Sequence, residues 1–167
     1  MRDKNPEPMS VMAEHAHLIM DAVPWAKALG FQVTKVEKGR AFALAPWRDD
    51  LVGDPDTGIV AGGVITALLD NLCGVATSAA LDEFKTLATL DLRIDYMRPA
   101  EPRVDIRGEA ECYHVTRSVA FVRAWAYHES REKVIATAAG AFALNDPKRW
   151  KIGGTAAAAK AAMETKT

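Results

Sequence analysis

Hydrophobic residues recur at helical spacing near the start of the chain. Over residues 9–23 this spacing predicts a helix with Ser10 as its N-cap. A further turn is predicted over Pro24–Leu29, and Gly30 ends it. We expect this helical segment to flank the rest of the fold.

Alternating polar and apolar positions follow and predict two short strands, over residues 31–36 and 40–45. The turn at Glu37–Gly39 between them indicates a hairpin. Residues 46–58 carry prolines, glycines and four aspartates and predict a long polar loop. Long loops in compact domains are more often functional than idle.

The most distinctive element is the apolar segment Val64–Leu81. Apolar side chains cover most of its helical circumference, which is typical of a helix buried in a core. Asp70 interrupts it, and burying an unpaired carboxylate costs several kcal/mol. Its neighbours three and four positions away are small, so a slender substrate could approach the carboxylate. A structural role, in which the carboxylate bonds a backbone amide or lies at the helix edge, is the alternative.

Two glycines, Gly62 and Gly63, precede this helix. The first turn of a helix has unpaired N–H groups and a partial positive charge, and glycine lets a carbonyl oxygen come close to them. A helix with such amides at its start and a carboxylate two turns later is suited to polarise a carbonyl and deliver an attack on it. A simple bend is the alternative explanation of the glycine pair.

Four further strands are predicted, over residues 89–97, 103–113, 118–127 and 134–144. The first alternates between an apolar face and a polar face that includes Thr89 and Asp91. The second directs Val104 inward. The last two are apolar on both faces, as in central strands or strands covered by a partner subunit.

The order helix, two strands, loop, buried helix, four strands predicts an α+β architecture, with an antiparallel sheet wrapped around one long central helix. Residues 1–8 are predicted to be a flexible leader, residues 9–146 a single domain, and residues 147–167 a marginal helix or a disordered tail. The polar and aromatic outer faces of the last strands suggest that a second copy packs there, forming a dimer.

Charge and composition narrow the classes of function. The 21 Lys+Arg and 22 Asp+Glu give a net charge of −1, which offers no electrostatic reason to expect nucleic acid or a membrane surface as a partner. Cys73 and Cys112 are too few for a disulfide scaffold, so a cytoplasmic location is expected. The four histidines are scattered and predict structural or surface positions, not a metal site.

Three segments resemble one known family. The run LVGDPDTGIVAGGVITALLDNLCG (residues 51–74) is similar to the helix-entry motif of hotdog-fold acyl-CoA thioesterases of the phenylacetyl-CoA thioesterase (PaaI) type. These enzymes belong to the 4-hydroxybenzoyl-CoA thioesterase superfamily. The runs TLDLRIDYMRPA (89–100) and HVTRSVAFVRAWAY (114–127) resemble the family's following strands, so the likeness spans about residues 25–145.

The resemblance implies a hotdog fold and a dimer or dimer of dimers. It also implies hydrolysis of an acyl-CoA thioester to acid and CoA, without a metal or redox cofactor. The family's catalytic carboxylate falls on Asp70, as general base or nucleophile. Its oxyanion donor falls on the backbone amide of Gly62, with Gly63 adjacent. A hydroxyl that positions the attacking water falls on Thr89, contributed across the dimer interface.

The resemblance also assigns nucleotide or phosphate contacts to Arg117 and Ser118, although a solvated arginine at a strand end is the commoner explanation of Arg117. Two positions depart from the family pattern. Ala61 stands where many members have histidine, and Asp54-Pro55-Asp56 stands where many have asparagine, so Asp54 or Asp56 would take over part of that polar role. A non-catalytic protein that binds or senses acyl-CoA on the same fold is therefore the alternative function.

Overall fold

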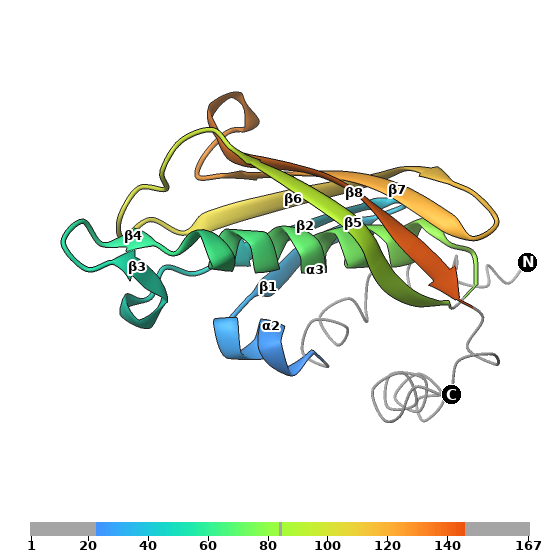
Figure 1. Ribbon diagram of the computed structural model, residues 1–167, viewed down its shortest axis with the longest axis horizontal. Coiled ribbons are helices and arrows are strands. Elements are labelled where there is room, and N and C mark those ends of the chain that lie inside the picture. The colour runs from blue at the N-terminus through green and yellow to red at the C-terminus, as the bar shows by residue number, and fades with distance from the viewer. Residues whose placement is uncertain (1–22, 84, 146–167) are drawn as a thin grey trace, which may run out of the picture.

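The computed structural model describes residues 23–83 and 85–145 (Figure 1). The predicted leader and tail, and all but the last residue of the predicted helix over residues 9–23, lie outside these ranges. Within them, the helices and strands follow the predicted order, with one small hairpin added.

Helix α2 spans Pro24–Leu29, and the long helix α3 spans Gly62–Ala80. Short 3₁₀ turns lie at Asp49–Leu51 and Arg131–Lys133. The strands are β1 (Gln32–Glu37), β2 (Arg40–Ala45), β3 (Val52–Asp54), β4 (Ile59–Val60), β5 (Thr86–Tyr96), β6 (Ile106–Val115), β7 (Val119–Tyr127) and β8 (Val134–Asn145).

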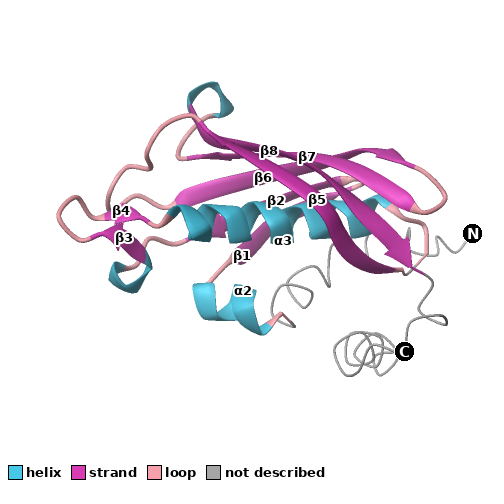
Figure 2. Ribbon diagram, in the orientation of Figure 1, coloured by secondary structure: helices cyan, strands magenta, loops and turns pink. Residues whose placement is uncertain are grey.

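Six strands form one antiparallel sheet in the order β1-β2-β6-β7-β8-β5, and α3 lies along one face of it (Figure 2). The pair β3-β4 forms a separate small sheet beside the start of α3 (Figure 1). A sheet that wraps one long helix confirms the predicted α+β class and has the arrangement of the hotdog fold.

Large side chains of α3 pack against small residues of the sheet. Leu68, Leu69 and Leu72 are fully buried. A Cβ placed on Gly108 of β6 would lie 2.9 Å from Leu72 Cδ2, so the backbone of β6 approaches the helix too closely for a side chain. The buried alanines of the neighbouring strands are Ala41, Ala43, Ala45, Ala110, Ala120, Ala124, Ala126, Ala136 and Ala138. Large leucines of α3 thus fill the space that small residues leave on this face of the sheet.

Helix α3 is long and apolar enough that its composition alone would permit a membrane crossing. The core helix of a globular domain has the same composition, and 56% of its most apolar 18-residue stretch is buried against the rest of the chain. Its apolar character is therefore explained by the packing just described.

The outer face of the sheet carries a network of charged and aromatic side chains. Glu109 is only 4% exposed and accepts hydrogen bonds from Arg40 Nη2 at 2.6 Å and Arg131 Nη1 at 2.9 Å. The guanidinium of Arg131 lies 3.6 Å from the centre of the Trp125 ring. The bond to Glu109 raises the pKa of Arg40 above its usual value. These contacts cover the middle of the outer face with groups that satisfy one another.

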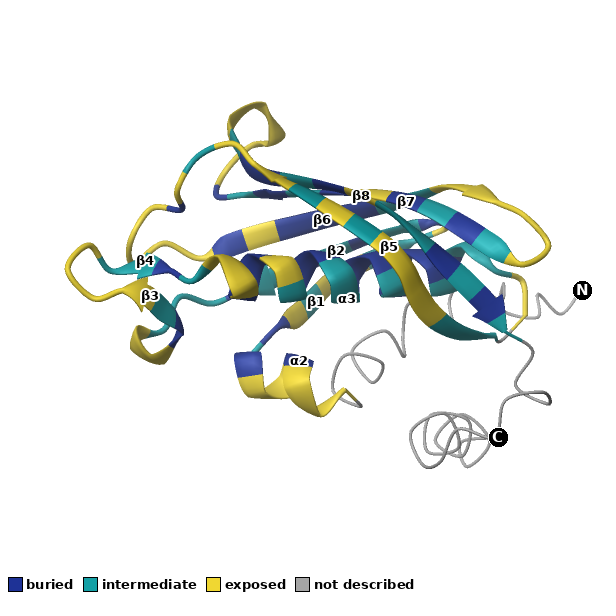
Figure 3. Ribbon diagram, viewed as in Figure 1, coloured by how far each residue is buried: buried dark blue, intermediate teal, exposed yellow. Residues whose placement is uncertain are grey.

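The two edges of the sheet differ. At one edge, β1 has an irregular register between Val33 and Lys35, and Lys35 pairs with Glu37. At the other edge, β5 is long and widely exposed (Figure 3). Exposed fractions reach 59% at Leu90 within β5 and 62% at Met97 just after it. Exposed apolar side chains on an unpaired edge strand are typical of a surface that another chain covers.

Two sequence predictions fail locally. The polar loop over residues 46–58 contains a 3₁₀ turn and strand β3, which pairs with β4. Strand β6 begins at Ile106, and Val104 is exposed instead of inward. The chain turns before β6, where Arg103 has a φ of +62°. A strand starting at residue 103 is incompatible with this turn.

Candidate active site

Asp70 lies near the middle of α3 and is held by a hydroxyl from the adjacent edge strand. Thr89 Oγ1 of β5 donates a hydrogen bond to Asp70 Oδ1 at 2.9 Å. Both residues belong to the same chain, so Thr89 reaches Asp70 without crossing a subunit interface. The contribution of Thr89 to a site across a dimer interface stays a prediction. Within the described ranges Asp70 Oδ2 has no hydrogen-bond partner, which leaves one carboxylate oxygen free to accept a proton or a bond.

A β-bulge turns Thr89 toward the helix. In the β5–β8 pairing Thr89 is opposite Phe142 and Asp91 is opposite Ala141, which leaves Leu90 without a partner. The extra residue reverses the alternation of side chains. Thr89 therefore shares the helix-facing side with Leu92, which packs against the core, and the predicted polar face that joined Thr89 to Asp91 is wrong.

Asp70 stands on an open stripe of the helix. Thr66 is exposed, and Ala67, Asp70, Asn71 and Gly74 are half-buried, whereas the large apolar residues of α3 lie on the other side. The sequence predicted a carboxylate within a helix apolar nearly all round. The structure corrects this to a small and polar face, because α3 is covered by the sheet on one side only.

The first turn of α3 presents backbone donors without a capping group. No side chain caps the helix at Ala61, and the first turn has no acidic residue. Gly62 and Gly63 are exposed, and within residues 23–83 and 85–145 their N–H groups have no hydrogen-bond partner. A Cβ on Gly63 would meet no atom within 4 Å, so there is open space beside these donors.

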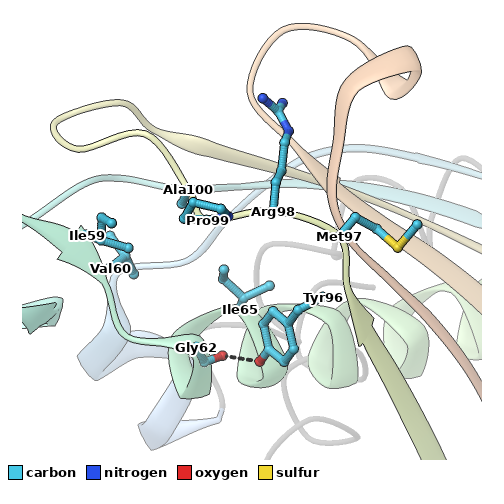
Figure 4. A pocket seen from close by; sticks show the side chains of 9 residues that line it. All are labelled: Ile59, Val60, Gly62, Ile65, Tyr96, Met97, Arg98, Pro99 and Ala100. Carbon is cyan, nitrogen blue, oxygen red and sulfur yellow. Dashed lines mark hydrogen bonds between the residues drawn. The ribbon is translucent and has the colours of Figure 1, made fainter.

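Tyr96, at the end of β5, is bound to this first turn. Its hydroxyl donates to the carbonyl oxygen of Gly62 at 2.6 Å (Figure 4). The same hydroxyl lies 2.8 Å from Thr66 Oγ1. In the strand predicted over residues 89–97, Tyr96 falls on the apolar face and carries no local sign of another role. Nothing local in the sequence could reveal the contact, because 34 residues separate Tyr96 from Gly62.

A cavity of about 390 Å³ lies beside the same turn (Figure 4). Apart from Tyr96 and Arg98, the side chains around it are apolar. They include Ile59, Val60, Ile65, Met97, Pro99 and Ala100. The Arg98 guanidinium points away from the helix in Figure 4 and binds the backbone oxygens of Val134 and Lys133. The cavity therefore suits an apolar or uncharged group.

His128 braces the segment that follows this cavity wall. It is 6% exposed, and its Nε2 accepts from the Glu101 N–H at 2.8 Å. Because Nε2 accepts, Nδ1 carries the hydrogen and donates to the backbone oxygen of Asp105 at 2.8 Å. The two bonds hold the chain between Ala100 and β6, and they give His128 a structural role.

Asp70 and the Gly62 amide are too far apart to meet one carbonyl group within a single chain. Eight residues separate them on a continuous helix, which corresponds to an axial rise of ~12 Å. One chain therefore carries the carboxylate and the amide donors as two separate half-sites.

The other predicted contact residues lie apart from these groups. Asp54 accepts from the Asp56 N–H at 3.1 Å and from the Thr57 hydroxyl at 2.6 Å, and the Thr57 bond above all lowers the pKa of Asp54. Asp54 thus shapes its own turn, and Asp56 is exposed within it. Arg117 and Ser118 are exposed in the β6–β7 turn, at the opposite end of the molecule (Figure 1).

The environments of the two cysteines do not favour the thiolate form that a cysteine nucleophile needs. Cys73 is fully buried, and burial together with the charge of Asp70 raises the pKa of its thiol well above the usual range. Burial also raises the pKa of Cys112. Thiolates are therefore disfavoured at both positions. Among residues 23–83 and 85–145, no three His, Cys, Asp or Glu side chains form a group able to hold a metal ion.

Comparison with known proteins decides the family. The profile of the thioesterase superfamily matches residues 57–135, which include α3 and strands β5, β6 and β7. The crystal structure of a Pseudomonas aeruginosa protein is 40% identical, with a TM-score of 0.73, and the match covers 79% of this chain and 98% of that one. The chain belongs to the thioesterase superfamily.

Within the superfamily, the chain is similar to PaaI proteins. A mutant of the phenylacetic acid degradation protein PaaI from Thermus thermophilus is 26% identical, with a TM-score of 0.63, over 72% of this chain and 97% of that one. The medium/long-chain acyl-CoA thioesterase YigI of Salmonella typhimurium is 33% identical over 92 residues, 46% of this chain and 58% of YigI. The chain spans about three fifths of the length of the curated relatives it matches. The predicted PaaI-type hotdog fold is confirmed.

Proposed function

We propose that this protein hydrolyses acyl-CoA thioesters to free acid and CoA, with Asp70 as the catalytic carboxylate. The observation that carries the proposal is the Asp70–Thr89 hydrogen bond of 2.9 Å on the open face of α3, in a chain whose helix begins with unpartnered amides. Family membership supports thioester hydrolysis, and YigI supports acyl-CoA as the substrate class.

The proposed chemistry needs only groups that this chain supplies. Thr89 holds one oxygen of Asp70, and the free oxygen takes a proton from a water molecule as that water attacks the thioester carbon. The negative charge that forms on the carbonyl oxygen is stabilised by the amides of Gly62 and Gly63. The carbon–sulfur bond then breaks, and the CoA thiolate recovers the proton from Asp70. No metal or redox cofactor enters these steps.

A nucleophilic role for Asp70 is the other form of the same proposal. Asp70 would then attack the carbonyl, the CoA thiolate would leave, and water would hydrolyse the resulting anhydride. A single turnover in H₂¹⁸O separates the two routes. Direct attack by water places the label in the acid product, whereas hydrolysis of the anhydride at the Asp70 carboxyl carbon places it in the protein.

The active site is proposed to form between two copies of the chain. Since ~12 Å of helix separates the Gly62 amide from Asp70, we infer that the amides of one copy face the carboxylate of the other. The exposed apolar side chains of edge strand β5 and the small residues on the open face of α3 support such a pairing. A symmetric dimer would then contain two complete sites, each made from the amides of one copy and the Asp70 of the other.

Release of free thiol from a panel of acyl-CoAs tests the proposal. The panel contains acetyl-, phenylacetyl-, decanoyl- and hexadecanoyl-CoA. We expect Asp70→Asn to lower kcat about a hundredfold or more, because it removes the base while keeping the shape of the side chain. Asp82→Asn, which alters an exposed carboxylate just after α3, is the matched control and should keep wild-type activity. Equal rates for wild type and Asp70→Asn would refute the assignment.

Binding without hydrolysis is the second candidate function. The observation that favours it is the start of α3, where Ala61 supplies no side-chain hydrogen bond to the donor turn. Calorimetry on the same panel decides between the two. Tight binding of an acyl-CoA with no release of thiol would select the binding protein, and turnover would select the enzyme.

A further inference from the structure

The geometry points to Tyr96 as a positioning residue for the oxyanion donors, acting together with Thr66. The inference rests on the proposed function, and it adds a side chain that orients and polarises the amide facing the substrate. It is drawn from three groups at the start of α3 that are linked one to the next by hydrogen bonds of 2.8 Å and 2.6 Å.

The direction of the hydrogen bonds follows from the groups involved. The Gly62 carbonyl only accepts, so the single hydroxyl proton of Tyr96 lies in the 2.6 Å bond to Gly62 O. The Thr66 hydroxyl must then donate to Tyr96 Oη across 2.8 Å. The result is an ordered series of hydrogen bonds that runs from the Thr66 hydroxyl through the Tyr96 hydroxyl to the Gly62 carbonyl.

This series of hydrogen bonds ends on the peptide group of Gly62 and Gly63, whose N–H has no hydrogen-bond partner among the described residues. The carbonyl of Gly62 and the N–H of Gly63 belong to the same planar amide. A hydrogen bond to the carbonyl oxygen draws electron density from the nitrogen, so the Gly63 N–H becomes a stronger donor. Tyr96 therefore acts on the oxyanion through the Gly62–Gly63 amide without contacting the substrate carbonyl itself.

The contact also gives the two glycines different roles. A Cβ on Gly62 would lie 3.2 Å from Tyr96 Oη, tighter than ordinary packing, so Gly62 admits the phenol. A Cβ on Gly63 would meet nothing within 4 Å, so Gly63 keeps the side facing the substrate open. Because Tyr96 and Gly62 both border the cavity of about 390 Å³, the tyrosine fixes this amide where an acyl-CoA would enter.

The first test is kinetic. Tyr96→Phe keeps the ring and removes the hydroxyl, and we expect kcat to fall about tenfold with little change in KM. Thr66→Val should lower kcat about threefold, since it removes only the hydrogen bond from Thr66 to the Tyr96 hydroxyl and keeps the bond from Tyr96 to Gly62. Thr66→Ser, which retains a hydroxyl, should restore wild-type kcat. Tyr113→Phe, at an exposed tyrosine whose ring packs on Arg123 of the outer face, is the matched control and should leave kcat unchanged.

A second readout reports on the carbonyl directly and needs binding but no turnover. Decanoyl-CoA carrying a ¹³C-labelled thioester carbonyl is bound to Asp70→Asn, and its carbonyl stretch is measured by infrared difference spectroscopy. We expect binding to shift this band to lower frequency, and the shift to be smaller in the Asp70→Asn, Tyr96→Phe double variant. A role confined to folding would change thermal unfolding but not the band.

The outcomes separate this inference from the proposed function. If the wild type hydrolyses acyl-CoA, and Tyr96→Phe changes neither kcat nor the carbonyl band, the inference is overturned. The proposed thioesterase function is then retained. Binding without turnover would remove the hydrolytic function, and a smaller band shift would still support the role of Tyr96. If no acyl-CoA bound at all, both would be overturned.

Discussion

Thr89 and Asp70 form a pair in which one side chain fixes the other. A half-buried aspartate on a helix has several rotamers available, and the 2.9 Å bond from Thr89 selects one of them. The bond occupies one carboxylate oxygen and directs the other away from Thr89. In the proposed mechanism, Thr89 would orient the carboxylate before a ligand arrives, which is how preorganised sites gain rate.

A prediction at the same scale concerns His128. His128→Ala leaves the Glu101 N–H and the Asp105 carbonyl without partners beside a buried position, and should lower the free energy of unfolding by about 1–3 kcal/mol. His128→Gln should cost less, because its amide oxygen can still accept from Glu101. Urea unfolding measures both variants. Equal stability of His128→Ala and wild type would contradict the bracing role.

The site was partly predictable at this scale. Asp70 and the glycine pair were found because each departs from a surrounding apolar pattern, and such departures are visible in one sequence. Tyr96 and His128 fit their local patterns, and their bonds join residues 23 to 34 positions apart. Their roles depend on tertiary contacts, which hydrophobic spacing does not encode.

At the scale of elements, the bulge in β5 decides which way Thr89 points. The bulge depends on Gly140 of β8, because a Cβ there would lie 2.5 Å from the backbone oxygen of Asp91 and 2.9 Å from Leu92 Cδ1. Without a side chain at residue 140, β8 can approach the irregular part of β5. One glycine on a central strand thus sets the orientation of a hydroxyl on the edge strand.

We therefore expect Gly140→Ala to push β5 away from β8. The change should destabilise the fold by about 1–3 kcal/mol, as overpacking does, and lower kcat by loosening the Thr89–Asp70 bond. Gly74→Ala is the matched control, because its Cβ would come no closer than 3.8 Å to another residue and it should stabilise α3 slightly. Thermal unfolding is measured on both variants, and thiol release is measured on Gly140→Ala against wild type. A Gly140→Ala variant with wild-type stability and activity would contradict this account.

Most elements were predictable from periodicity, and the failures are local. The hairpin, α3 and the last strands follow regular patterns, so their existence was predicted correctly. The bulge was missed because strict alternation was assumed through Leu90. Strand β4 was missed because it has only two residues, too few to show a period.

At the scale of the whole molecule, the two half-sites predict complementation between chains. Gly63→Leu places its side chain in open space, so it should fold and cover its own amide donors. Asp70→Asn lacks the carboxylate. A mixed dimer of the two contains one intact site, made from the amides of one chain and the Asp70 of the other.

We expect each variant alone to be nearly inactive and an equal mixture, after dissociation and reassociation, to recover about a quarter of wild-type activity. This fraction follows because half of the randomly formed dimers are mixed and each has one working site of two. Thiol release from the mixture is the measurement, with a mixture of each variant and Asp82→Asn as the reference. If mixing restored no activity, the site would have to lie within one chain.

The unequal edges of the sheet also limit how far such chains can assemble. Strand β1 has only six residues and an irregular register, which make that edge a poor template for strand addition. Strand β5 has eleven residues and exposes Leu90 at its bulge, so it offers the longer and more apolar edge. If two chains pair through β5, each partner contributes the same edge strand. The resulting dimer then has no free β5 edge to which a third chain could add. We therefore expect strand pairing to close after two chains, which guards a protein with a long unpaired strand against fibre formation even at high concentration.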